Sequence, residues 1–268
     1  MIDLLSALLI VVLLCCSAGL GMFISPRLPP AQRARETVEM MTLTIGMLVT
    51  FAALVLGLIT ASVKSAYDDA IHYRQEYALQ LTQLDRCLRN YGAGADAARA
   101  YIRSYTAAAI ASIWPSEPPP VGVHYPDTSG MHNLIITGEV PAITDLMNHA
   151  GLEISRFSPT DAAQARIAEN CRQDYRDVVR ARLIVQETKN ARLSAPFYQI
   201  LVFWLMIIFA SFGLVAPRHS LSLISIALCA VSLSTAIFVI FGLSRPYDGL
   251  FAVSSTPMRT ALDSMLRP

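Results

Sequence analysis

Residues 40–63 read MMTLTIGMLVTFAALVLGLITASV and contain no charged residue and no histidine. A helix of about 20 such residues is long enough to cross the hydrocarbon core of a bilayer. Three other stretches meet the same test of length and polarity. The expected spans are Leu4–Ser25, Met40–Val63, Phe197–Ala216 and Leu221–Leu243. The sequence therefore predicts an all-α membrane protein with four transmembrane helices.

The first of these stretches has a second interpretation, a cleaved signal peptide. Its apolar run is longer than the core of a typical signal peptide, and no Lys or Arg precedes it. We therefore expect a retained transmembrane helix.

The overall composition agrees with a multi-span protein. Of the 268 residues, 54% are hydrophobic and only 15% are charged, and the mean hydropathy is +0.45. Soluble domains have roughly a quarter of their residues charged. The formal net charge of +1 argues against a nucleic-acid partner, which would require a basic face. The lipid bilayer is the expected surrounding.

The chain divides into four parts around these spans. Residues 1–63 hold the first two helices and a short Arg-rich loop, and residues 197–243 hold the last two. Between them, residues 64–196 are expected to form a helical extramembrane domain inserted between spans two and three. Residues 244–268 are expected to form an amphipathic tail in the membrane interface, with Met258, Leu262 and Met265 on its apolar side.

Apolar periodicity predicts the helices of the inserted domain. A heptad-like seam continues straight out of the second span, which predicts one long helix ending at Gly92. Its members are Ala70, Arg74, Tyr77, Leu81, Leu84, Leu88 and Tyr91. Asp96 is expected to cap a second helix, and Ser158, followed by Pro159, a helix that returns to the membrane. The apolar stripe of the returning helix is Ala168, Cys171, Tyr175, Val178 and Val185.

The arginines predict which side the inserted domain faces. Arg27, Arg33 and Arg35 follow the first span, and Arg218 lies in the short turn between spans three and four. Short loops rich in Arg stay in the cytoplasm, whereas long domains are largely exempt from this rule. Both termini and the inserted domain are therefore predicted to lie on the outer side.

Cys87 and Cys171 are the only cysteines outside the expected spans. At about 1.5 Å per helical residue, both lie roughly 33–35 Å from the membrane if their helices stand straight and side by side. An outward-facing domain would lie in an oxidising compartment. We therefore predict a Cys87–Cys171 disulfide, and the alternative is two unrelated buried thiols.

Small residues recur at steps of three and four in two spans. In span two they are Thr42, Gly46, Thr50, Ala53, Gly57 and Ala61, and in span four Ser225, Cys229, Ser232 and Ala236. Such stripes allow the backbones of helices to approach closely in lipid, within or between subunits. The alternative is a pore lined by hydroxyl groups.

Other candidate chemistry is sparse. Asp68 and His72 lie on one helix face just beyond span two, with Asp69 beside them, and could form an ion site at a pore mouth. The alternative is a solvated helix face. The remaining histidines have no metal-ligand spacing, and no Ser or Cys has the context of a nucleophile. We expect no metal, no cofactor and no catalytic residue, and therefore not an enzyme.

The charge-free spans also limit the kind of transport. Proton relays and ion-coupled transporters usually need ionisable groups at bilayer depth. A channel gated by apolar constrictions does not. The sequence therefore favours a channel over a pump or a secondary transporter.

Three stretches resemble a known family. They are FWLMIIFASFGLVAPRHS at 203–220, RPYDGLFAVSSTPMRTAL at 245–262, and LDRCLRNYG at 84–92 with IWP at 113–115. Together they resemble bacterial inner-membrane proteins that share a domain of unknown function and are labelled bestrophin-like. Ser244, Tyr247 and His219 depart from the usual residues of that pattern.

The resemblance implies a location and a function class. It implies the bacterial cytoplasmic (inner) membrane and, because true bestrophins are pentameric anion channels, a homo-oligomeric channel. No pore constriction, binding residue or catalytic residue can be transferred to positions of this chain. The rival hypothesis is a non-conducting scaffold or sensor whose outer helical domain binds a partner in the envelope.

Overall fold

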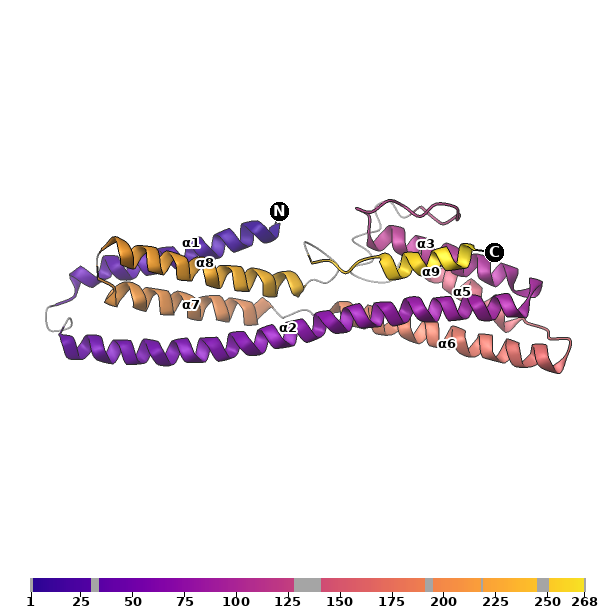
Figure 1. The fold of residues 1–268 in the computed structure, drawn as a ribbon, viewed down its shortest axis with the longest axis horizontal. Helices are drawn as coiled ribbons and strands as arrows, with labels where there is room; N and C mark the ends of the chain where they lie inside the picture. The colour runs from indigo at the N-terminus through magenta and orange to yellow at the C-terminus, as the bar shows by residue number, and fades with distance from the viewer. Residues whose placement is uncertain are drawn as a thin grey trace. The chain divides into compact units, whose positions relative to one another are not determined.

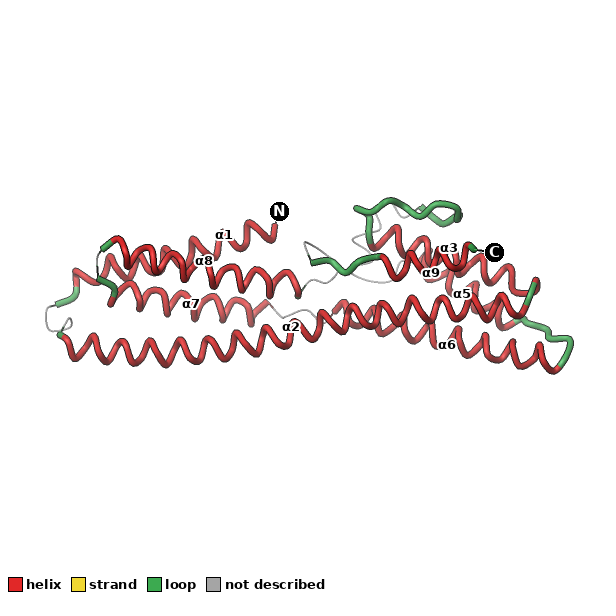
Figure 2. The backbone as a smooth tube through the Cα atoms, in the orientation of Figure 1, coloured by secondary structure: helices red, strands yellow, loops and turns green. Residues whose placement is uncertain are grey.

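The computed structural model describes residues 2–29, 34–127, 141–190, 195–217, 219–244 and 251–267. Within these ranges the regular structure is helical and no strand occurs (Figure 2). The α-helices, labelled as in Figure 1, are α1 (Ile2–Ile24), α2 (Arg35–Tyr91), α3 (Asp96–Ile113), α5 (Pro141–Ser155), α6 (Ala162–Asn190), α7 (Ala195–Val215), α8 (Ser220–Leu243) and α9 (Thr256–Leu266). The predicted all-α class is confirmed.

The chain forms two compact units. The first unit comprises Met1–Tyr67 and Arg192–Ala252, and the second comprises Asp68–Ala191 and Val253–Pro268. Helix α2 contributes its first part to one unit and its remainder to the other, because the helix predicted from span two continues without a break to Tyr91. Gly92 ends α2 with a φ of 97°, a conformation that favours glycine.

The first unit contains the apolar helices. Helix α1 packs against both α7 and α8 (Figure 1). Its core includes Leu14 and Ala18 of α1, Phe209 of α7 and Ile237 of α8, and α2 adds Ala52. Among the described residues, α1, α2 and α8 are long and apolar enough to cross a membrane, and the apolar stretch of α7, Gln199–Val215, is shorter. The fold therefore contains several membrane-grade helices, as expected.

The second unit has a hydrophobic core of its own. All seven residues of the predicted seam on α2 are buried. The five seam residues from Tyr77 to Tyr91 share a core with Ile102 and Tyr105 of α3, Met147 of α5 and Val178 of α6. Tyr91 at the end of α2 stacks on Phe157, with ring centroids 4.1 Å apart. The heptad reading therefore identified the face of α2 that this domain buries.

Two helix starts differ from the sequence predictions. Helix α6 begins at Ala162, and its N-terminal amides are capped by Asp161, whose Oδ1 accepts from the backbone N–H of Ala163 and Gln164 at 2.8 Å. Ser158 instead donates to Arg156 O. Asp96 occupies the first turn of α3 rather than capping it by a side-chain bond. Before α6, Ser158, Thr160 and Asp161 are all possible caps, and the sequence does not rank them. Before α3, a 3-10 turn at Ala93–Ala95 leads directly into the helix, so Asp96 falls inside its first turn.

The C-terminal helix corrects a further expectation. Met258, Ala261, Leu262 and Met265 of α9 are buried in the core of the second unit, where α9 packs on α3. Trp114 Nε1 donates to Val253 O at 2.8 Å, and Arg259 Nε donates to Glu117 at 2.9 Å. Protein covers the apolar side of α9, so the expectation that this helix lies in the membrane interface is wrong.

Candidate functional site

The small-residue stripe of α2 is exposed along its whole length in the single chain. Its members are Thr42, Gly46, Thr50, Ala53, Gly57 and Ala61. A Cβ atom added to Gly46 or Gly57 would meet no atom within 4 Å. The hydroxyl groups of Thr42 and Thr50 donate to carbonyls of their own helix, Val38 O and Gly46 O. The stripe therefore has no tight packing partner among the described residues of this chain.

Helix α2 has three distinct faces within the first unit. Ile45, Ala52 and Val63 are buried on one face. At about 100° per residue, the small residues form a second face and the large, exposed Phe51 and Leu58 lie on a third. Large apolar side chains suit lipid contact, whereas small ones allow a second helix to approach. This separation marks the stripe as the surface available for close helix contact.

Helix α8 shows the same division. Ser225, Cys229 and Ser232 are exposed. Its buried face carries Ala230, Ser234 and Ile237, and Ser234 Oγ donates to Ala7 O of α1 at 2.7 Å. Ala236, the fourth member of this stripe, is partly buried. Packing of the two stripes, within or between subunits, stays a prediction.

Helices α1 and α7 are in close backbone contact, at residues that the sequence predictions did not include. A Cβ atom on Gly21 would overlap Ala210 O, and one on Gly213 would overlap Ala18 O. Ser17 Oγ donates to Met206 O at 2.6 Å across the same interface. The signal was present in the small residues of 17–21 (SAGLG) and 210–213 (ASFG). Their runs are short, whereas the stripe of α2 extends through the whole span.

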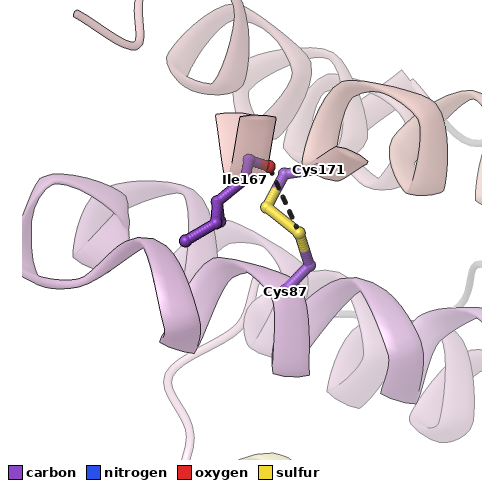
Figure 3. The surroundings of a disulfide bond; sticks show 3 residues. All are labelled: Cys87, Ile167 and Cys171. Carbon is purple, nitrogen blue, oxygen red and sulfur yellow. Dashed lines mark hydrogen bonds between the residues drawn. A yellow bond between two sulfur atoms is a disulfide. The ribbon is translucent and has the colours of Figure 1, made fainter. Parts of the chain in front are cut away.

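A disulfide joins Cys87 of α2 to Cys171 of α6 (Figure 3), with Cα atoms 5.5 Å apart. Cys171 is buried and Cys87 is partly buried. Cys87 Sγ also lies 3.6 Å from Ile167 O, the dashed contact in Figure 3. A disulfide sulfur carries no proton, so this is a packing contact rather than a hydrogen bond. The predicted pairing is present in the structure.

The candidate ion site beyond span two is an exposed part of α2. Asp68, Asp69 and His72 are all exposed, and the His72 ring lies 5.9 Å from that of Tyr73. Within the described ranges, no three His, Cys, Asp or Glu side chains are placed to hold a metal ion. The ion site at a pore mouth stays a prediction. The predicted orientation rests on four arginines. The structure describes Arg27 and Arg35, whereas Arg33 and Arg218 lie outside the described residues.

Solved structures share this fold. Two point variants of a bacterial bestrophin homologue from Klebsiella pneumoniae superpose with TM-scores of 0.70 and 0.69, at 14% and 13% sequence identity. Each alignment covers 98% of this chain, with 96% and 100% of the respective homologue. A structure described as a membrane protein aligns with a TM-score of 0.66 at 14% identity and 97% coverage of both chains. At such identities the likeness shows the fold alone.

No curated protein matches the chain significantly in sequence. The sequence profile of the Bestrophin-like domain, in contrast, matches residues 12–258. This range includes the stripes of α2 and α8, both disulfide cysteines and the start of α9. Because the match covers nearly the whole chain and agrees with the shared fold, the chain belongs to the Bestrophin-like domain family.

Proposed function

We propose that this protein is a self-associating, channel-like protein of the bacterial inner membrane, in which several copies of the chain enclose a path for ions. The observation that carries the proposal is the exposed stripe of α2. Six small residues on one side of a membrane-grade helix are exposed, and a Cβ atom at Gly46 or Gly57 would meet no atom of the described residues within 4 Å. Small residues on a helix surface allow the backbone of another helix to approach closely in lipid, so the stripe suits contact with a helix of another copy.

The chemistry of the stripe suits either a subunit contact or a pore wall. The hydroxyl groups of Thr42 and Thr50 donate hydrogen bonds to carbonyls of their own helix. The donors are therefore satisfied, and the hydroxyl oxygens remain on the helix surface as acceptors. Small side chains permit a short distance between two helices, and hydroxyl oxygens can replace part of the hydration shell of a cation. The favoured role of the stripe is tight packing between copies, and the alternative is lining the pore.

The family relationship supports the same function. The chain carries a Bestrophin-like domain and shares the fold of bacterial bestrophin homologues. True bestrophins conduct anions as pentamers. In this proposal the protein is not an enzyme, its surroundings are lipid, and four helices (α1, the first part of α2, α7 and α8) cross the membrane.

The proposed orientation places the second unit on the outer side. The disulfide between Cys87 and Cys171 supports it, because disulfides persist in the bacterial periplasm and are rare in the cytosol. Arg27, shortly after the end of α1, and Arg35, at the start of α2, flank the short loop between these helices. They support the orientation because short basic loops prefer the cytoplasm.

The oligomeric mass of the purified protein tests the proposal. Light scattering with subtraction of bound detergent is expected to give several chains per particle. A strict monomer would contradict it, because four helices of one chain leave little room for a central pore.

A second candidate function is a non-conducting scaffold or sensor. The second unit supports it, because this unit encloses its own hydrophobic core and carries a covalent cross-link. Such a domain could bind an envelope partner without any ion flow. The two candidates differ in whether the reconstituted protein conducts.

A further inference from the structure

The second unit buries the carboxylate of Asp85 beneath arginine side chains. Asp85 of α2 is only 3% exposed. It accepts hydrogen bonds from Arg99 of α3 at 3.0 and 3.4 Å and from Arg89 of α2 at 3.2 Å. Arg89 also donates to Ser264 O in the last turn of α9, at 3.2 Å. Two guanidinium groups from different helices therefore meet at one carboxylate.

Arg103 adds a third guanidinium group to this place. It follows Arg99 by one turn on α3, and its Nε atom is buried without an acceptor within the part of the chain that the structure describes. Burial and the neighbouring Arg99 guanidinium lower the pKa of Arg103, although an arginine stays protonated at neutral pH. The carboxylates that act on it are Asp85 and the exposed Asp96.

One buried donor of this cluster, Arg103 Nε, has no acceptor among the described residues. Arg99 already binds Asp85 with two of its nitrogens, so the ion pair is complete without Arg103. A buried donor without a partner destabilises the fold unless a ligand supplies the acceptor. The planar fork of a guanidinium group matches the oxygens of a carboxylate or a phosphate better than a spherical anion.

We propose that Arg89, Arg99 and Arg103 form a binding site for an oxyanion, the carboxylate or phosphate group of a small solute. The site belongs to the second unit and is separate from the stripe of α2, so it goes beyond ion permeation. Because Arg89 also holds the last turn of α9, an occupied site would couple the solute to the anchoring of the C-terminal helix.

Thermal unfolding and titration calorimetry of the full-length protein in detergent test this site. Inorganic phosphate, acetate and chloride are compared at one pH and one ionic strength. Phosphate or acetate is expected to raise the unfolding temperature above its value in chloride, with about one ligand bound per chain. Arg103→Gln is expected to weaken binding by roughly 10-fold or more, because a charge-assisted hydrogen bond is lost.

The direction in which Arg103→Gln changes the stability of the protein distinguishes a binding site from a structural ion pair. Without ligand, the variant should be as stable as wild type or more stable, since a buried donor and a repulsion are removed. With ligand, wild type should become the more stable protein. Arg103→Lys keeps the charge and loses Nε, so we expect an affinity between those of wild type and Arg103→Gln. This variant also allows the site to be tested if Arg103→Gln does not fold. Arg180→Gln removes an exposed arginine of α6 as the charge control and should bind normally.

The outcomes are distinct. Stabilisation by phosphate alone or by acetate alone supports the site and identifies the group it accepts. Equal stabilisation by both oxyanions and by chloride would overturn the proposal. It would also fail if Arg103→Gln or Arg103→Lys bound the oxyanion as tightly as Arg180→Gln.

Discussion

Gly213 of α7 lies against the backbone of Ala18 on α1, so closely that a Cβ atom at position 213 would overlap the Ala18 carbonyl oxygen. Gly57 of α2, in contrast, faces open space in the single chain. Both glycines belong to apolar helices of the same unit. Substitutions at these two positions can therefore distinguish packing within a subunit from the proposed packing between subunits.

We expect Gly213→Leu and Gly57→Leu to fail in different ways. Gly213→Leu must push α1 and α7 apart, which should lower the stability of the subunit by about 1–3 kcal/mol or more. Gly57→Leu should leave the subunit folded and reduce the oligomeric mass. Thermal unfolding and light scattering of each variant measure the two effects, with Leu58→Ala as the control. Wild-type assembly of Gly57→Leu would show that the stripe has no packing role.

The disulfide should be present in protein purified without reductant. Mass spectrometry of a non-reduced digest should find the peptides of Cys87 and Cys171 linked. Because the bond closes a loop across a separation of 84 residues, Cys87→Ser or Cys171→Ser should cost about 2–4 kcal/mol of stability. Cys16→Ser, at an exposed free cysteine outside both stripes, should change little. Free, alkylatable thiols at both positions would contradict the pairing and weaken the proposed orientation.

The orientation has its own test. An alkaline phosphatase fusion at Pro118 should be active, because the enzyme requires an oxidising compartment, and a fusion at Arg33 should be inactive. The reverse pattern of activity would place the second unit in the cytoplasm.

The C-terminal helix should stabilise the second unit. Met265 is fully buried and its neighbour Leu266 is 38% exposed. Met265→Ala should therefore destabilise the protein by about 2–5 kcal/mol, whereas Leu266→Ala should have little effect. Denaturant unfolding in detergent compares the two variants. Equal, small effects of the two substitutions would contradict the packing of Met265 in the core of the second unit.

Local periodicity was sufficient where one face of a helix meets one core. The spacing from Ala70 to Tyr91 predicted both the length of α2 beyond the membrane and the residues that it buries. The positions of Cys87 and Cys171 on facing stripes predicted the disulfide. The burial pattern needed only the rise and the repeat of a helix. The disulfide prediction also needed the absence of other cysteines outside the expected spans and an oxidising compartment.

The sequence could not identify what covers an apolar or small surface. The stripe of α2 and the short runs around Gly21 and Gly213 look alike as patterns, yet among the described residues Gly21 and Gly213 lie against another helix and Gly46 and Gly57 do not. The apolar side of α9 would suit lipid as well as α3, and the choice depends on long-range bonds such as Trp114 to Val253. The sequence did not mark Arg103 as a candidate, because its surroundings depend on the packing of α2, α3 and α9, which are distant in the sequence.

Ion flux in proteoliposomes shows directly whether this protein conducts ions. Purified protein is reconstituted, and flux is recorded for chloride, nitrate, potassium and sodium, with empty liposomes and inserted Gly57→Leu protein as controls. The account predicts flux of at least one of these ions with wild type, and a loss of flux with Gly57→Leu in proportion to its loss of assembly. No conductance for any of the four ions in wild-type protein of confirmed oligomeric mass would contradict the channel function and favour the scaffold.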